Sequence, residues 1–210
     1  MLTVTLSAAY GAGGSYVGPR LAEQLGLRFL DRAIPAAVAG QLGVELAEAV
    51  AHDGRSEHGF GRLLTAIGRV PSATLGGLTG FLPPDQLTDE TVFAEHTARL
   101  LREVADDTGA VILGRAAAVV LAGRPQVLHV RMSGPPEARA KQASRLRGVD
   151  LDTTRTRLRD NDAAREAYVK NLYGRDPRDP ALYHVVLDST ALTLDTCVNL
   201  LVTAARSIAV

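Results

Sequence analysis

A glycine-rich stretch directly after the first apolar run constrains this chain more than any other feature. Leu2, Val4 and Leu6 alternate with polar residues, and this alternation predicts a strand. The glycine-rich turn Gly11–Ser15 follows, and residues 20–26 have the spacing of a helix. In a strand–turn–helix unit of this kind, backbone N–H groups and the N-terminus of the helix can face an anion.

The turn differs from the phosphate-loop motif G-x-x-x-x-G-K-[ST] at two positions. Ala8 stands in place of the first glycine, and Gly14 stands in place of the lysine. On the turn alone, two other interpretations stay open. In a dinucleotide-binding fold, Asp31 would meet a ribose hydroxyl twenty residues after Gly11, although Tyr16 occupies the third glycine position. Alternatively, the glycines serve a tight turn that binds nothing.

A proline near the start of the expected helix bears on where that helix begins. Inside a helix, Pro19 would remove one hydrogen bond and clash with the preceding turn. A helix that began at Gly14 would carry this proline beyond its first turn. We therefore expect the helix to begin nearer Val17 or to kink at Pro19, which would make the turn longer than a standard phosphate loop.

Strands and helices alternate along the rest of the chain. Further strands are predicted at 27–31, 110–114, 126–132 and 184–188, and helices at 35–52, 60–70, 88–106, 135–147, 152–172 and 192–208. This order predicts an α/β fold with a five-stranded, mostly parallel sheet and helices on both faces. Residues 53–89 are rich in glycine and proline and predict a loop-rich insert. No linker divides the chain, so we expect one domain over residues 1–210.

Composition and charge exclude several classes of partner. The 23 basic and 23 acidic residues cancel, so no global field draws the protein to nucleic acid or to an anionic membrane. The single cysteine, Cys197, indicates a reducing compartment. The N-terminus lacks a signal-peptide pattern, and the longest apolar run, residues 116–122, is too short to cross a bilayer. We therefore expect a cytoplasmic protein.

The histidines do not predict a structural metal site. His52 and His58 lie in the loop-rich insert with no cysteine nearby, and His129 lies in a predicted strand whose neighbours favour burial. Zinc sites in proteins combine cysteine and histidine ligands at characteristic spacings, which this chain lacks. We therefore expect no structural metal.

Seven short motifs occur in a fixed order along the chain and decide between the interpretations of the turn. They are residues 10–14, 29–32, 112–115, 124–130, 136–139, 161–165 and 187–192. The series resembles the cytidylate kinase-like family, relatives of the nucleoside monophosphate kinases, from Leu2 to about Leu201. Residues 168–179, rich in tyrosine and ending in Gly-x-Asp, resemble the bacterial branch of that family.

The resemblance implies a three-layer P-loop kinase fold and gives the turn a role. It implies an acceptor-side insert at 53–89 and a lid at about 139–160, with residues 148–154 as its loop. It also implies that ATP phosphates are bound by Gly11, Ala12, Gly13, Gly14 and Ser15, and that the Ser15 hydroxyl meets Mg²⁺. From residue type alone, Ser15 suits a helix N-cap equally well.

The resemblance also implies an acceptor site and a catalytic set. Asp31 would face the acceptor, and Arg115 would grip its phosphate, for which a planar guanidinium is suited. From the residues alone, Asp31 also suits an N-cap and Arg115 a solvent-exposed position. Relatives with kinase activity commonly carry an acid directly after this arginine, whereas this chain has Ala116.

Charged residues of the lid region complete the catalytic set that the resemblance implies. Arg139, Asp162 and Arg165 would close over the transferring phosphoryl group. A solvated helix face with intrahelical ion pairs is the alternative interpretation, and for Arg145 it is the one we favour.

Two functional hypotheses follow. The first is a phosphotransferase that moves the γ-phosphoryl group of ATP, with Mg²⁺, to CMP or a similar small phosphate acceptor. The second is a nucleotide-binding, sensing or assembly module on the same fold, which the absence of the loop lysine favours, since Gly14 brings no charge to the β- and γ-phosphates. The segment 168–183 is a candidate interface for a homo-oligomer.

Overall fold

In the computed structural model, residues 1–31 and 84–208 are described, with side chains in the second range described at 94, 95 and from residue 97 onward. The predicted helices at 35–52 and 60–70, and the expected insert up to residue 83, lie outside the described residues. The hypothesis that Asp31 caps the next helix is not tested, because that expected helix also lies outside the described residues.

Five strands form one sheet, and every neighbouring pair is parallel. The order across the sheet is β2 (Arg28–Leu30), β3 (Ala110–Leu113), β1 (Thr3–Ala8), β4 (Val127–Ser133) and β5 (Val185–Asp188). The predicted number of strands is confirmed. Because all five strands run the same way, their carboxyl ends meet at one edge, where ligands bind in open α/β sheets.

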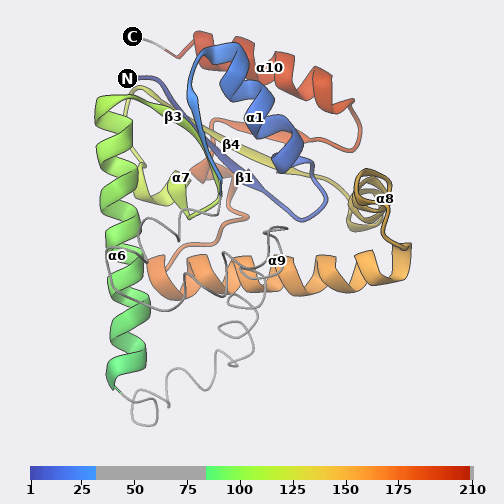
Figure 1. The fold of residues 1–210 in the computed structure, drawn as a ribbon, viewed down its shortest axis with the longest axis horizontal. Helices are drawn as coiled ribbons and strands as arrows, with labels where there is room; N and C mark the ends of the chain where they lie inside the picture. The colour runs from blue at the N-terminus through green and yellow to red at the C-terminus, as the bar shows by residue number, and fades with distance from the viewer. Residues whose placement is uncertain (32–83, 209–210) are drawn as a thin grey trace.

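Helices cover both faces of the sheet, which confirms the three-layer α/β prediction (Figure 1). On one face, α1 (Gly14–Leu25) and α10 (Leu194–Arg206) bury Leu21 and Leu201 against Leu6 of β1. On the other face, α6 (Pro84–Asp107) and α7 (Ala117–Val120) pack with Ile112 of β3. Of the three central strands, β3 is apolar on both sides, whereas β1 and β4 place the buried polar residues Thr5 and His129 on one of their faces.

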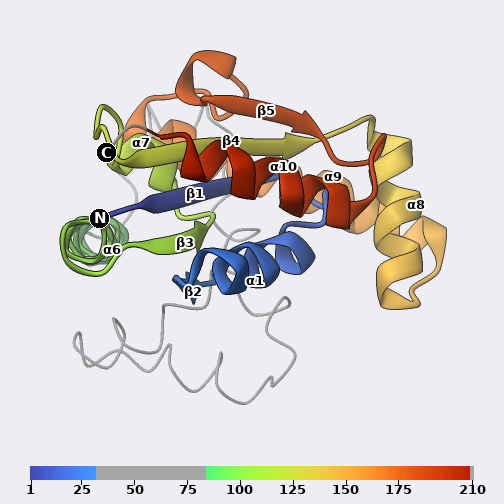
Figure 2. The ribbon, with the colours of Figure 1, turned by 90° about the horizontal axis from the view of Figure 1, so that it is seen from above.

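Two consecutive helices joined by a tight turn follow β4, and we call them the helical hairpin although their axes cross. The first stands beyond the carboxyl ends of the strands (Figure 1, Figure 2). The two helices are α8 (Pro136–Arg147) and α9 (Leu151–Tyr173), and they fall in the expected lid region. Their connection is only residues 148–150, shorter than the loop at 148–154 that we expected. Gly148 ends α8 with φ +65°, and the Asp150 carboxylate caps α9 by accepting from the Thr153 N–H at 2.8 Å.

Two expected helix starts are wrong. Helix α1 begins at Gly14 rather than near Val17, because the Gly13 carbonyl already accepts from both Tyr16 and Val17. Pro19 and Ser15 are both exposed, so the bond that the proline removes lies on the solvent side of the helix. Helix α6 begins at Pro84 rather than near residue 88, because the fixed φ of proline suits the first helical position.

The tyrosine-rich segment contributes to packing within the chain. The ring of Tyr168 is buried, and with Val169 it packs against Ala116 and Val119 beside α7. The segment then passes through a short 3₁₀ helix, Pro180–Leu182, into the edge strand β5. The role of residues 168–183 as an interface between copies stays a prediction.

Candidate functional site

The turn between β1 and α1 keeps the length of a phosphate loop. Ala8 ends the strand and Gly14 begins the helix, so residues 9–13 connect them. Gly11 and Gly13 both have φ of +78°, a conformation that glycine adopts without strain. Gly13 is the N-cap residue and Ser15 lies in the first turn, so the interpretation of Ser15 as an N-cap is wrong.

Side chains from distant elements hold three carbonyls of this loop and the last carbonyl of β1. The donors are Arg165 to Ala8 at 2.7 Å, Arg139 to Tyr10 at 2.8 Å, Gln142 to Gly11 at 2.9 Å and Ser189 to Ala12 at 2.7 Å. A trans peptide unit points its C=O and the next N–H in opposite directions. Fixing the carbonyls of Tyr10 and Ala12 therefore turns the N–H groups of Gly11 and Gly13 away from those side chains, as an anion-binding loop requires.

An ion pair connects the loop to the helical hairpin. The Asp162 carboxylate accepts from the Tyr10 N–H at 2.9 Å and from the Arg139 guanidinium at 2.7 Å. Arg139 is 6% exposed, and its Nε donates to the Gly134 carbonyl at 2.9 Å. Charge-assisted bonds of this kind are stronger than neutral ones. The loop, α8 and α9 are consequently joined through one buried arginine.

The side chain of Tyr10 adds a second connection between loop and hairpin. It is 5% exposed and packs among Ala140, Ala143 and Leu158, which belong to α8 and α9. The Arg147 guanidinium lies 4.9 Å from the centre of the Tyr10 ring, within range of a cation–π interaction. The loop is thus packed into the hairpin by an apolar contact as well as by hydrogen bonds.

Ala8 and Gly14, the two residues that differ from the phosphate-loop motif, lie next to each other. A Cβ atom added to Gly14 would lie 2.5 Å from the Cβ of Ala8 and 3.0 Å from Cδ1 of Leu113. Carbon atoms in ordinary contact are about 3.5–4.0 Å apart. The methyl group of Ala8 therefore occupies the space that a lysine side chain at position 14 would need at its base.

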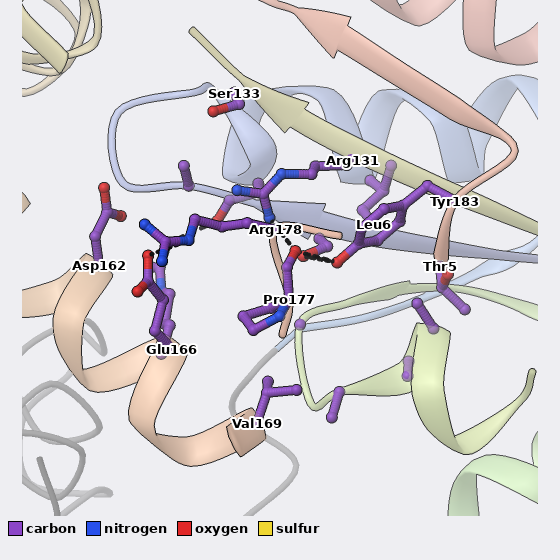
Figure 3. Close-up of a pocket in the computed structure, with 18 of the residues that line it drawn as sticks. Thr5, Leu6, Arg131, Ser133, Asp162, Glu166, Val169, Pro177, Arg178 and Tyr183 are labelled. Atoms are coloured by element: carbon purple, nitrogen blue, oxygen red, sulfur yellow. Dashed lines mark hydrogen bonds and ion pairs between the residues drawn. The ribbon is translucent and has the colours of Figure 1, made fainter. Parts of the chain in front are cut away.

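A cavity of about 300 Å³ opens beside the loop, at the carboxyl ends of β1 and β4 (Figure 3). Its walls come from these strands, α7, α9 and the segment 177–183. Charged residues from five elements or segments line it, and arginines outnumber acids. The arginines are Arg115, Arg131, Arg139, Arg165 and Arg178, and the acids are Asp162 and Glu166. Such a lining favours an anionic ligand.

Arg115 reaches this cavity through an unusual backbone. It has φ of +63° and Ala116 has φ of +51°, directly after β3. Left-handed conformations are uncommon outside glycine and cluster at functional sites. Arg115 is only 5% exposed, so the interpretation of it as a solvent-exposed arginine is wrong.

The predicted residues fall into three places. Arg115, Arg139, Asp162 and Arg165 line one cavity, and Arg139 and Arg165 also donate to the backbone just before Gly11–Ser15, at Tyr10 and Ala8. Asp31 follows β2 and does not line the cavity. Arg145 is exposed on α8, as its helix-face interpretation requires.

Sequence reasoning missed several residues of this site. Arg131 and Tyr183 line the cavity, whereas Gln142 and Ser189 hold the loop carbonyls. A signal existed for Arg131, because an arginine interrupts the apolar strand Val127–Ser133. Ser189 lies in the motif at residues 187–192, which gave it no individual role, and Gln142 gave no signal, since a glutamine on a polar helix is ordinary.

A buried histidine contacts one of the residues that line the cavity. His129 is 4% exposed, which agrees with the expected burial, and its Nδ1 lies 2.9 Å from the hydroxyl of Thr5, a cavity-lining residue. Burial, and secondarily the nearby His184, lower the pKa of His129 to about 4. The ring is therefore neutral at physiological pH and adds no charge to the site.

Residues 1–31 and 84–208 contain neither a metal-binding cluster nor a membrane-spanning helix. No group of three or more His, Cys, Asp or Glu side chains there is arranged to hold a metal ion. No helix in the same ranges has the length and apolar character needed to cross a membrane.

Comparisons with known proteins identify the family of this chain and support its fold. A model of the cytidylate kinase-like family matches residues 3–191. A cytidylate kinase of Methanopyrus kandleri is 31% identical over 111 residues, which cover 49% of this chain and 58% of that protein. The chain thus matches less than two thirds of the length of this relative.

Solved structures support the fold. An uncharacterized protein from Eubacterium ventriosum superposes with a TM-score of 0.66 and 16% identity over 99% of both chains. A Thermus thermophilus protein gives a TM-score of 0.50 and 18% identity over 99% of this chain and 98% of its own. The P-loop kinase fold implied by the sequence resemblance is confirmed, and the chain belongs to the cytidylate kinase-like family.

Proposed function

We propose that this protein is a phosphotransferase that moves the γ-phosphoryl group of ATP, with Mg²⁺, to CMP or a similar small phosphate acceptor. The observation that carries the proposal is the cavity in which Arg115, Arg139 and Arg165 meet beside the glycine loop. Phosphoryl transfer needs positioning and neutralisation of charge more than covalent chemistry. Membership of the cytidylate kinase-like family, and the curated relative named cytidylate kinase, support the same reaction class.

The loop fits the phosphates of a nucleotide. Gly11, Ala12, Gly13, Gly14 and Ser15 would hold them, since the fixed carbonyls turn loop N–H groups away from the side chains and the N-terminus of α1 favours negative charge. The Tyr10 N–H already donates to Asp162, so this donor maintains the shape of the loop. Ser15, exposed in the first turn of α1, would offer one ligand to Mg²⁺, which when bound neutralises phosphate charge.

The arginines take the part that a loop lysine would play. Arg139 donates to a loop carbonyl and Arg165 to the last carbonyl of β1, and both also line the cavity, so they lie between donor and acceptor positions. Arg115 would bind the acceptor phosphate from the end of β3. Asp162 holds Arg139 in place through the 2.7 Å ion pair. Asp31, at the end of β2, remains a candidate for the acceptor side.

A second function, nucleotide binding without transfer, is favoured by one observation. Asp162 pairs with Arg139 and so offsets part of the charge nearest the loop, while Gly14 contributes none. Preorganised charge at the transferring group is worth about 3–4 kcal/mol in enzymes. A protein that retained the loop but lacked this charge would bind nucleotide and turn it over slowly or not at all.

Release of ADP from ATP distinguishes the two functions. The wild-type protein is assayed with Mg²⁺ and a panel of acceptors that includes CMP, and its melting temperature is measured with ATP and ADP. Transfer predicts acceptor-dependent ADP release that Arg115→Met lowers by about 100-fold or more in kcat/KM. Arg159→Met, an exposed arginine of α9 outside the cavity, is the matched control.

The remaining outcomes separate the hypotheses. A nucleotide-dependent rise in melting temperature with no turnover for any acceptor would favour the binding module. If millimolar ATP and ADP both leave the melting curve unchanged, both functions are excluded.

A further inference from the structure

We propose that the acceptor carries a second anionic group, a carboxylate or a phosphate, which Arg131 binds at the carboxyl end of β4. This proposal rests on the proposed phosphotransferase function and specifies its substrate class. The first anionic group would be the phosphate near Arg115 and Arg165. The second would lie at the part of the cavity wall formed by β4 and the segment 177–183.

The position of Arg131 is fixed by the backbone of a neighbouring segment. Its side chain leaves β4 into the cavity (Figure 3), and Nη1 donates to the carbonyl of the buried Pro177 at 2.5 Å. Its guanidinium carbon lies 5.9 Å from the centre of the Tyr183 ring. A guanidinium has five N–H groups, so a single carbonyl leaves most of this fork available to bind oxygen atoms in a bidentate way.

Hydroxyl groups surround the same position. The Tyr183 hydroxyl donates to the Pro177 carbonyl at 2.8 Å and lies 3.2 Å from Oγ of Ser7. Ser7 and Ser133 both line the cavity. One carbonyl therefore orients both Arg131 and Tyr183, and neutral hydroxyls stand close to the cation. Because the Tyr183 hydroxyl donates to Pro177, the donors that remain beside the fixed guanidinium are the hydroxyls of Ser7 and Ser133, and this combination suits an oxyanion.

The two acidic residues of the cavity pair with arginines other than Arg131. Asp162 pairs with Arg139 at 2.7 Å, and Glu166 lies 3.4 Å from Nε of Arg178. Among the described residues, no ion pair includes Arg131, whose hydrogen bond goes to a neutral carbonyl. A ligand that covered this guanidinium without offering negative charge would leave it desolvated and uncompensated, which is costly.

Another part of the cavity wall supports a compact acceptor. It is formed by residues 116–119, which are alanines and a valine and bring no negative charge. A volume of about 300 Å³ lies at the small end of ligand pockets. The acceptor class that fits is a small molecule with a phosphate at one end and a second oxyanion a few bonds away.

The test compares three probes of similar size by isothermal titration calorimetry on the full chain. Glycerol 3-phosphate carries one anionic group, 3-phosphoglycerate adds a carboxylate, and 1,3-propanediol bisphosphate adds a phosphate. Each is titrated with and without saturating ADP and Mg²⁺, because ADP occupies the glycine loop if the proposed function is right. We expect at least one doubly anionic probe to bind about 10- to 100-fold tighter than glycerol 3-phosphate.

Variants assign the preference to Arg131. Arg131→Met is expected to abolish the preference while leaving the affinity for glycerol 3-phosphate within about twofold of wild type. Arg131→Lys keeps the charge but loses the bidentate fork, so it should retain part of the preference. It also serves if the methionine variant does not fold. Arg159→Met on α9 is the control. The probe that shows the preference identifies the second group as carboxylate or phosphate.

Three results would overturn the inference. They are equal affinities for all probes in the wild type, a preference that survives in Arg131→Met, and an equal loss for singly and doubly anionic probes. The proposed function is tested separately in the same experiment by the binding of ADP. ADP binding together with an Arg131-independent preference rejects the inference alone. An Arg131-dependent preference in a protein that binds no nucleotide rejects the proposed function and leaves the second-anion site standing.

Discussion

The ends of β1 and β4 lie side by side at the carboxyl edge of the sheet, and they are built in opposite ways. At the end of β1, the backbone forms the candidate site, and four side chains from distant segments hold its carbonyls. At the end of β4, a side chain forms the candidate site, and the backbone carbonyl of Pro177 holds it.

This difference has consequences for mutation. A backbone site depends on conformation and on every group that fixes it, so substitutions there should change stability and binding together. A side-chain site on a rigid strand can lose its functional group with little effect on folding. The five predictions below test this contrast, from the largest expected effect to the smallest.

Gly11→Ala should cause the largest loss of stability. A Cβ at this position would lie 2.3 Å from the Arg139 carbonyl oxygen, and φ of +78° is strained for alanine. We expect a loss of about 3 kcal/mol in the free energy of unfolding, measured by chemical denaturation. Gly26→Ala is the matched control, with φ of +66° and no atom within 4 Å. Equal losses for both variants would show that contact with α8 does not matter.

Asp162→Asn should follow. It removes the negative partner of Arg139, a guanidinium that is 6% exposed, and weakens the hydrogen bond to the Tyr10 N–H. We expect a loss of about 2–3 kcal/mol, together with weaker binding of ADP in calorimetry. Asp160→Asn, on the exposed face of the same helix, should change neither quantity. A stable variant with normal ADP affinity would contradict the view that Asp162 shapes the loop.

The contact between positions 8 and 14 should appear as a coupling energy. Gly14→Ala brings two Cβ atoms to 2.5 Å, and Ala8→Gly removes one of them. A double-mutant cycle should therefore give a favourable coupling of about 1–2 kcal/mol in the double variant. Additive single effects, measured by denaturant unfolding, would mean that the strand shifts to accept the extra methyl group.

His129 makes the stability of the sheet depend on pH. Its pKa is lowered from 6.5 to about 4 in the folded protein by burial and by His184, so the unfolded chain binds more protons between these values. Stability should therefore be unaffected by this group above pH 7 and should fall as the pH drops from 6.5 to 4. Melting curves should show a smaller fall over this window for His129→Gln. If the wild type and His129→Gln lose stability equally as the pH falls, His129 is not the group responsible.

Arg131→Met should have the smallest effect on folding. The residue is half-buried, and its substitution removes one hydrogen bond to a carbonyl on another segment. We expect a loss of less than about 1 kcal/mol in denaturant unfolding. A loss as large as that of Gly11→Ala would remove the contrast between the two strand ends.

Short-range patterns explain which parts of the fold could be predicted. Alternating apolar residues such as Val4 and Leu6 predicted the strands, and the order of strands and helices predicted a parallel sheet. The start of α1 was predicted wrongly, because the rule against proline in a helix does not show that Pro19 faces solvent. The start of α6 at Pro84 was missed because proline favours both a loop and a first helical turn.

The candidate site could be predicted only in part. Arg115, Arg139, Asp162 and Arg165 were identified through motifs, and the structure brings them to one cavity. The bonds from Gln142 and Ser189 to the loop span 131 and 177 residues of sequence, and neither residue type is distinctive. Asp31 was identified in the same way as the arginines, yet it lies outside that cavity.

The sequence alone determined the architecture, the family and the departure from the phosphate-loop motif at Ala8 and Gly14. These properties depend on local periodicity and on the order of motifs, both of which can be read directly from the linear sequence. Only the tertiary structure decided that Ala8 fills the space at Gly14, that Asp162 holds both Arg139 and the loop, and that Arg131 faces the same cavity as Arg115. The physical reason is that contacts between residues far apart in sequence depend on side-chain direction and packing, which local patterns do not encode.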